Sequence, residues 1–191
     1  MSGLLNPPVK TTILTVLLLI CMVPSLTQAQ SNPQTGPTNL GAESDAQKAF
    51  EKMKTLAGSW QGTIMGISIN FTIRTASSGT AILHEGNRVG GRGVPDHEIT
   101  MFYVEGNRLL ATHYCDAGNR SRFEGKMSPD EKTIEFTFLD VIGSTRGGYL
   151  KGIVFTIIDA NHHTAELTFV PPSGKPMPFR GEFQRTNFTP N

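Results

Sequence analysis

The sequence Thr112-His113-Tyr114-Cys115 contains the two side chains of this chain best suited to chemistry. Successive side chains of a β-strand point to opposite faces, so His113 and Cys115 share one face and Tyr114 lies on the other. An imidazole and a thiol on one face could ligate a soft metal ion, or act as a base and a nucleophile. The simpler interpretation is that both line an apolar cavity as satisfied polar groups, and we expect that role.

Two ligands make a poor metal site, and no other His or Cys has a spacing that obviously completes one. We therefore expect no metal. An enzyme that uses His113 with Cys115 or Tyr114 at the mouth of a barrel is the alternative hypothesis. The sequence contains no nucleophile elbow, phosphate loop, zinc-protease helix or dinucleotide fingerprint, which favours binding over catalysis.

His162 and His163 are adjacent at the point where one expected strand turns into the next. Neighbouring strand residues point to opposite faces, so the two cannot readily chelate one ion. A solvated turn is the simpler interpretation for the pair. The parity of His163 matches that of Leu167 and Phe169, however, which makes His163 a candidate for the cavity lining.

Arginines supply the remaining candidates. Arg122 shares its parity with Glu124, with which it could pair, and we include Arg122 among the cavity-lining candidates. The segment GNRVGGRGVPD (residues 86–96) has too many Gly and Pro residues for a regular strand and predicts a flexible loop with Arg88 and Arg92. At the mouth of a barrel these two could contact an anion, although a solvated loop is the simpler interpretation.

Alternating side chains predict the elements that must position these residues. Apolar residues alternate with polar ones from Ile67 to Ile73, as in a half-buried strand. Further short strands are expected, separated by turn sequences: 80–85, 98–104, 108–114, 120–127, 133–139, 148–159, 164–170 and 177–184. Because so long a meander leaves unpaired edges unless it closes, we predict an all-β fold, an antiparallel up-and-down barrel of about ten strands. A sandwich is the alternative, but the connections look like hairpins throughout.

One short amphipathic helix should precede the barrel. Apolar residues at helical spacing run from Asp45 to Leu56, and Gly58 follows. A barrel of about ten strands encloses more space than side chains fill, so a ligand cavity is expected inside.

The charge balance and the amino-terminal apolar run limit what the protein binds and where it is located. The 17 Lys and Arg residues are balanced by 16 Asp and Glu residues, so no strong field attracts nucleic acid. Residues 11–23 (TTILTVLLLICMV) form an apolar run that is shorter than the roughly 20 residues of a membrane span. With Pro24 and the small Ala29 behind it, the run predicts a signal peptide over residues 1–29.

Export to the periplasm or the medium is therefore expected, with no stable membrane span after cleavage. Residues 30–44 then form a flexible lead, and residues 45–187 form the barrel domain. The mature chain keeps Cys115 alone, so no disulfide can form within it. Cys21 leaves lipidation open, although Ile20 before it does not fit the small residue of a bacterial lipoprotein motif.

Gly58-Ser59-Trp60-Gln61-Gly62 resembles the Gly-x-Trp-x-Gly opening of lipocalin-like (calycin) barrels, including nitrobindin-type haem barrels. The resemblance implies that Trp60 packs across the closed end of the barrel, between the first strand and the opening helix. Gly58, Trp60 and Gly62 are thus candidate structural residues. In a nitrobindin-type barrel a late His would hold haem iron, but residues 177–184 contain none. His163 is the nearest candidate, and we expect no cofactor.

A second, longer stretch resembles a group of exported bacterial lipocalin-like proteins of unknown function. It comprises Thr100-Met101-Phe102-Tyr103, Gly106-Asn107-Arg108-Leu109, Thr112-His113-Tyr114-Cys115 and Gly118-Asn119. The whole resemblance covers about residues 50–185 and confers no activity. We expect an exported barrel that binds a small, largely apolar molecule. The enzyme above and an envelope interaction module with a filled barrel are the alternatives.

Overall fold

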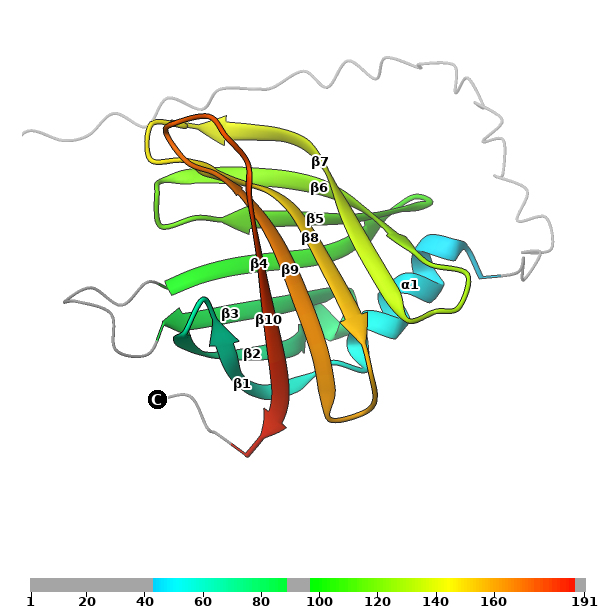
Figure 1. Cartoon of the computed structure of the whole chain (residues 1–191). Helices are drawn as coiled ribbons and strands as arrows, with labels where there is room; N and C mark the ends of the chain where they lie inside the picture. The colour runs from blue at the N-terminus through cyan, green and yellow to red at the C-terminus, as the bar shows by residue number, and fades with distance from the viewer. Residues whose placement is uncertain (1–42, 89–96, 188–191) are drawn as a thin grey trace, which may run out of the picture. The chain divides into compact units, whose positions relative to one another are not determined.

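Ten antiparallel strands close into one barrel, preceded by a single helix (Figure 1). The computed structural model describes residues 43–88 and 97–187. Each strand pairs with its neighbours in the sequence, and β1 closes the barrel against β10. The predicted up-and-down barrel with one short helix in front of it is confirmed.

Where the connection between consecutive strands lies within the described residues, it is short, as the turn sequences predict. The strands are β1 (Gly58–Ile64), β2 (Ile67–Ala76), β3 (Ala81–Arg88), β4 (His97–Glu105), β5 (Arg108–Tyr114), β6 (Asn119–Met127), β7 (Thr133–Gly143), β8 (Tyr149–Ile157), β9 (His162–Val170) and β10 (Met177–Thr186). A short 3-10 turn, Ser77–Gly79, lies between β2 and β3.

Alternation of side chains builds the core. In β6, Ser121, Phe123 and Gly125 are buried, whereas Arg120 and Arg122, which alternate with them, are exposed. Gly125 is needed there because a Cβ at this position would lie 2.6 Å from Phe136 Cε1. The strands therefore carry one apolar face inward all round the barrel.

Helix α1 (Asp45–Lys54) covers one end of the barrel. Ser44 caps it by accepting a hydrogen bond from the Gln47 N–H at 3.2 Å. Phe50 and Met53 are buried in the same cluster as the barrel core, and Leu56, just after the helix, joins them. The helix thus lies over the end of the barrel where β4 turns into β5 and where β1 begins.

Several boundaries differ from the sequence prediction. Strand β3 runs to Arg88, so the first three residues of the predicted loop 86–96 belong to a strand. Residues 89–96, which include Arg92, lie outside the described residues. Strand β9 begins at His162, two residues before the predicted strand, because His162 and His163 pair with Gln184 and Phe183 of β10. Tertiary pairing extends the strand beyond its alternating pattern.

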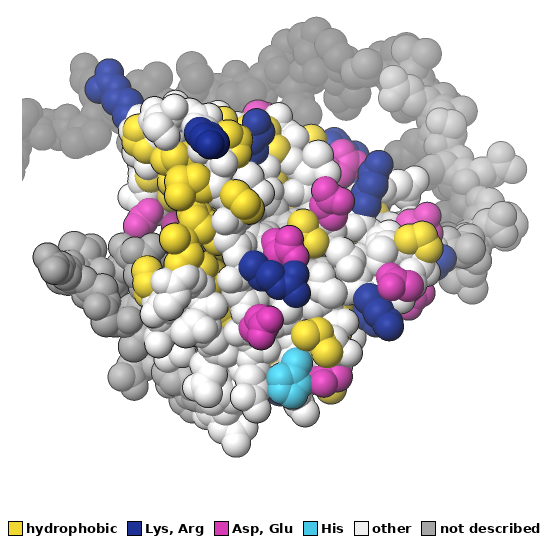
Figure 2. Space-filling view, viewed as in Figure 1, with side chains coloured by type: hydrophobic (Ala, Val, Ile, Leu, Met, Phe, Trp, Pro, Cys, Tyr) yellow, Lys and Arg dark blue, Asp and Glu magenta, His cyan; other side chains and the backbone are white. Residues whose placement is uncertain are grey.

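The outer surface is mixed. Figure 2 shows positive and negative side chains interspersed over the visible face, beside a band of hydrophobic side chains. Exposed pairs such as Arg180 with Glu166 bridge neighbouring strands. Within the described ranges, no helix has the length and apolar character needed to cross a membrane. The signal peptide predicted over residues 1–29 and the lead up to residue 42 fall outside the described residues.

Candidate functional site

Trp60 organises the end of the barrel beside α1. Its indole is fully buried and donates a hydrogen bond from Nε1 to the Leu56 carbonyl at 2.8 Å. Gly62, two residues on, admits the close approach of β10, because a Cβ there would lie 2.1 Å from the Glu182 carbonyl oxygen. Gly58 has φ +144°, a backbone conformation that residues with a side chain rarely adopt. Trp60 therefore ties the first strand to the residues behind the helix.

Arg185, near the end of β10, covers the other face of this indole. Its guanidinium carbon lies 4.4 Å from the centre of the Trp60 ring. The same guanidinium donates to the Ala57 carbonyl at 2.5 Å, to the Thr55 carbonyl at 3.1 Å and, through Nε, to the Ala160 carbonyl at 2.8 Å. One side chain thus connects the last strand to the helix end and to the β8–β9 hairpin.

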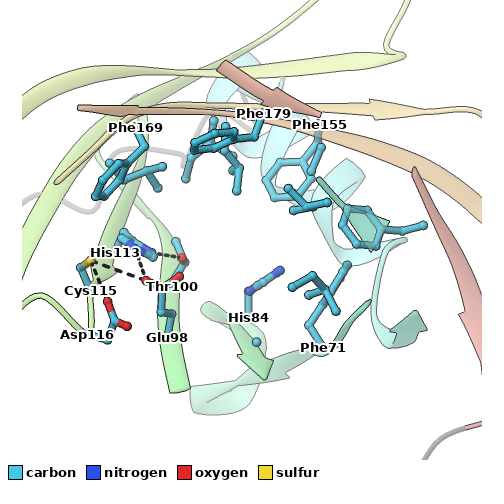
Figure 3. Close-up of a pocket in the computed structure, with 18 of the residues that line it drawn as sticks. Phe71, His84, Glu98, Thr100, His113, Cys115, Asp116, Phe155, Phe169 and Phe179 are labelled. Atoms are coloured by element: carbon cyan, nitrogen blue, oxygen red, sulfur yellow. Dashed lines mark hydrogen bonds and ion pairs between the residues drawn. The ribbon is translucent and has the colours of Figure 1, made fainter. Parts of the chain in front are cut away.

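The opposite end of the barrel is hollow. A cavity of about 400 Å³ is lined by the end of β1, the starts of β2 and β4, and the segment after β5. Its apolar wall contains several aromatic rings, drawn in Figure 3: Phe71, Phe155, Phe169 and Phe179. Met65 and Ile67 also line it and are exposed, so the cavity opens at the β1–β2 hairpin. A cavity of this size is typical of small-molecule sites.

A row of polar side chains crosses the inner face beside the cavity. His84 of β3 is paired in register with Thr100 of β4, Thr100 with His113 of β5, and His113 with Ser121 of β6. Residues opposite each other in antiparallel strands share a face, which is why these four side chains meet. Thr100 Oγ1 lies 2.9 Å from His113 Nδ1 in a buried hydrogen bond. The sheet register therefore assembles polar groups from four separate strands.

Three possible ligand atoms gather at one side of the cavity: a carboxylate oxygen of Glu98, Nε2 of His113 and Sγ of Cys115 (Figure 3). Glu98 Oε1 lies 3.9 Å from His113 Nε2 and 3.5 Å from Cys115 Sγ. The Asp116 carboxylate is also 3.5 Å from this sulfur. The sequence offered no third His or Cys to complete a metal site with His113 and Cys115. The structure brings a third possible ligand from the adjacent strand β4, the Glu98 carboxylate.

Burial sets the protonation of these groups. Desolvation lowers the pKa of His113 to about 4, although the charge of Asp116 opposes this shift. The pKa of His84 falls to about 3, chiefly by desolvation and further through His113 and His163. Desolvation raises the pKa of the Cys115 thiol to about 12, and the Glu98 and Asp116 carboxylates add to the rise. At neutral pH the imidazoles are therefore neutral and the thiol keeps its proton.

The four residues predicted to line the cavity, His113, Cys115, Arg122 and His163, do not all lie there. His113 and Cys115 both line the cavity, and Tyr114 between them points outward. Arg122 is on the outer face, where its guanidinium pairs with Asp140 of β7, so its inclusion in the lining is wrong. Side chains alternate without a break along β6, so Ser121 and Phe123 face the core and Arg122 between them faces outward. The register shift beside Arg122 skips Leu139 of β7 and leaves this alternation unchanged.

His163 occupies neither of its expected positions. Its side chain is fully buried, so it is not part of a solvated turn, and it is not among the residues that line the cavity. It lies edge-on to Trp60 with ring centres 4.2 Å apart and stacks on Phe183 at 5.4 Å. Desolvation, helped by the charge of Arg185, lowers its pKa to about 4. His163 belongs to the aromatic packing of the closed end.

The position of His163 and the charges of the cavity lining show whether this barrel suits haem. His163, the expected axial candidate, is separated from the cavity by its aromatic neighbours and does not line it. Haem also carries two propionates, while the described lining contains the carboxylates Glu98 and Asp116 and neither Lys nor Arg. The described residues therefore do not fit the haem arrangement in which His163 is the iron ligand.

Sequence reasoning missed three residues of this site: His84, Thr100 and Glu98. Each lies on a strand that the sequence predicts. Which residues of the neighbouring strands it contacts depends on the register between β3, β4 and β5. Thr100 shares a face of β4 with the buried Phe102, but alternation within one strand gives no reason to pair it with His113.

A closed antiparallel barrel with a helix at one end and a cavity at the other has a lipocalin-like barrel fold. The solved structure of Rv2717c from M. tuberculosis is similar, with a TM-score of 0.53 and 14% sequence identity, over 73% of this chain and 98% of that chain. A protein of unknown function of the DUF3598 family from Nostoc punctiforme aligns over 72% of this chain and 99% of its own, with 8% identity and a TM-score of 0.24.

At 14% identity, the similarity to Rv2717c concerns the fold alone. No model of a known protein family matches the chain, and no curated protein matches it either.

Proposed function

We propose that this chain is an exported protein whose barrel binds one small, largely apolar molecule with a neutral or cationic polar end. The cavity carries the proposal. Its walls are mostly aromatic and aliphatic, which favours an apolar body. Its polar groups gather on one side, where they can orient a single polar end of that body.

The charge of the lining defines the polar end. Two carboxylates, Glu98 and Asp116, face the cavity, and the described lining residues include no Lys or Arg. An anionic head group would lose hydration without gaining a countercharge from the described lining residues. A hydroxyl or an ammonium group can instead donate hydrogen bonds to the carboxylates or to a neutral imidazole. The proposed ligand is thus an alcohol, an amide or an amine rather than a fatty acid.

The protonation of Cys115 supports binding over nucleophilic catalysis. A thiolate is the reactive form of cysteine, and a pKa of about 12 leaves almost none at neutral pH. His113, with a pKa of about 4, is a weak base. The hypothesis that His113 and Cys115 act as a base and a nucleophile is therefore less well supported than ligand binding.

Displacement of a fluorescent apolar probe by three molecules of equal chain length tests the proposed ligand class. Dodecanol and dodecylamine should displace the probe, and dodecanoate should do so at least about 10-fold more weakly, a difference of about 1.4 kcal/mol. Dodecanoate binding as tightly as dodecanol would contradict the proposed polar end. A failure of all three, together with no probe binding, would contradict the cavity as a binding site.

Gly86→Leu tests whether this cavity is the site. Gly86 lines the cavity, and among the described residues a Cβ there meets His84 Cε1 at 3.7 Å and Phe71 Cβ at 3.9 Å, so a larger side chain can extend into the cavity. Gly152→Leu is the matched control, since its Cβ meets Thr168 at 3.6 Å and Gly152 does not line the cavity. Probe affinity should fall at least about 10-fold in the first variant and remain unchanged in the second.

Export has its own test. We propose cleavage after Ala29, so amino-terminal sequencing of the protein purified from its host should begin at Gln30. Recovery of the chain with residues 1–29 intact, in the cytoplasmic fraction, would contradict this part of the proposal and leave the cavity unaffected.

A further inference from the structure

The cluster of Glu98, His113 and Cys115 brings three different metal-binding groups to one point. All three ligand atoms lie within 4.8 Å of one another. In a tetrahedral zinc site, bond lengths of about 2.0–2.3 Å place ligand atoms roughly 3.3–3.7 Å apart. The Glu98–Cys115 distance of 3.5 Å is already in that range, and the Glu98–His113 distance of 3.9 Å is close to it. His113 Nε2 and Cys115 Sγ lie within 4.8 Å of each other, so side-chain rotations that bring these two atoms together would complete the geometry.

The surroundings of His113 orient it as a ligand. When Nδ1 donates to Thr100 Oγ1, 2.9 Å away, the lone pair of Nε2 is directed to the side of Glu98 and Cys115. A hydrogen bond of this kind on the other ring nitrogen is the usual support of a metal-binding histidine. Thr100 is buried, so this orientation is fixed from within the barrel.

Access and charge also suit a cation. The side chain of Glu98 is 41% exposed, so an ion can reach the cluster from the cavity mouth. Asp116, 3.5 Å from the Cys115 sulfur, adds negative charge without any Lys or Arg among the described lining residues. A mixed sulfur, nitrogen and oxygen ligand set is one that Zn²⁺ accepts.

We propose that Glu98, His113 and Cys115 bind one zinc-class divalent cation at the wall of the cavity, with Thr100 as the positioning residue of His113. Three protein ligands leave the fourth position of a tetrahedral ion facing the cavity, for water or for the polar end of a ligand. On binding, the Cys115 S–H bond breaks, its proton goes to solvent and the sulfur bonds to the metal. No electrons are transferred in this step.

Cobalt and zinc titrations of the purified protein test the site without any apolar ligand, so their outcome is independent of the proposed cavity function. Co²⁺ should bind in a one-to-one ratio and give the near-ultraviolet charge-transfer absorption of a cobalt–thiolate bond. Zn²⁺ should then abolish this absorption, and its affinity follows from competition with a chromogenic chelator. Saturating Co²⁺ without the thiolate absorption would overturn the proposal.

Two variants test proposed ligands, a third tests the positioning residue and a fourth is the control. Cys115→Ser should remove the thiolate absorption, and Glu98→Gln should lower the Zn²⁺ affinity at least about 10-fold while keeping an exposed side chain of the same shape. Thr100→Val should weaken binding about 10-fold but keep the absorption, as expected for a residue that acts through His113. His162→Gln is the control, because His162 forms an exposed pair with Asp159 at another end of the barrel.

The control variant also shows which result would contradict a metal site at the cavity wall. An equal loss in His162→Gln, or full Zn²⁺ affinity in Cys115→Ser, would show adventitious surface binding and overturn the proposal. Circular dichroism of each variant confirms the fold, and Glu98→Gln keeps the test valid if Cys115→Ser should unfold.

Discussion

The two ends of this barrel differ in what their side chains do. At the end covered by α1, Trp60 and Arg185 donate hydrogen bonds to four backbone carbonyls, and neither residue lines the cavity of about 400 Å³. At the other end, Glu98, His113 and Cys115 face a cavity of about 400 Å³. One end contributes stability, and the other keeps open space and polar groups that a ligand can reach.

This difference shows how a tightly packed end and an open end can coexist in one barrel. A barrel closed by hydrogen bonds all round has no edges to protect, so only its ends need covering. Packing at one end can supply the stability that a cavity at the other end forgoes, since each unfilled volume lowers the free energy of unfolding. The following predictions test that division, beginning with the largest effect.

Trp60→Ala should reduce the free energy of unfolding by about 4 kcal/mol, because a fully buried indole and its hydrogen bond are lost. Phe179→Ala at the cavity should cost no more than about half as much, since that ring is only half-buried and already faces open space. Urea unfolding of both variants measures the comparison. Equal losses would contradict the division between the two ends.

Acid should weaken the closed end through His163. Its pKa is about 4 in the folded protein and 6.5 when exposed, so the unfolded chain binds the proton first as the pH falls. His163 therefore removes about 2 kcal/mol of stability between pH 7 and pH 4.5. His163→Leu should lack this part of the pH dependence, while His84 and His113 retain theirs. Identical pH slopes in urea unfolding would rule out this role.

Arg185→Ala should lower the free energy of unfolding by about 1–2 kcal/mol, because three carbonyls lose a charged donor and Trp60 loses its cation–π partner. Arg180→Ala on the same strand is the matched control. Arg180 pairs with Glu166 on the exposed face, where an ion pair contributes little. Thermal unfolding in which the two variants behave alike would refute the proposed clamp.

Cys115→Ser should change the free energy of unfolding least, by less than about 1 kcal/mol, because Cys115 is half-buried at the cavity mouth. Thermal unfolding in the presence of a chelator measures this without any metal contribution. A loss as large as that of Trp60→Ala would show that the open end is part of the stabilising core.

Local patterns in the sequence predicted the barrel because alternation acts within a strand. The parity of His113 and Cys115 placed both on one face, which is the cavity side. The packing of Trp60 at the closed end was implied by the resemblance to lipocalin-like barrels, not by alternation. Arg185 was not foreseen, since its carbonyl acceptors lie up to 130 positions away in the chain.

Local sequence patterns show which residues share a face of a strand. They do not show which face turns inward or which residues of other strands lie opposite. His84, Thr100 and His113 meet only because three strands align in one register. Arg122 was misplaced because its shared parity with Glu124 does not say which face of β6 turns inward, and Ser121 and Phe123 are the residues that do. The turn beside His163 favoured a solvated position and its parity favoured the cavity wall, whereas pairing with Phe183 places it in the core.

The most direct test of the account is an NMR titration of the protein with dodecanol, with the shifts mapped onto the barrel. We predict that the perturbed residues cluster at the open end, around Gly86, Thr100, His113 and Phe179, while Trp60 and Arg185 stay unchanged. Perturbations confined to the outer face, or centred on Trp60, would contradict the claim that the open end is the binding end.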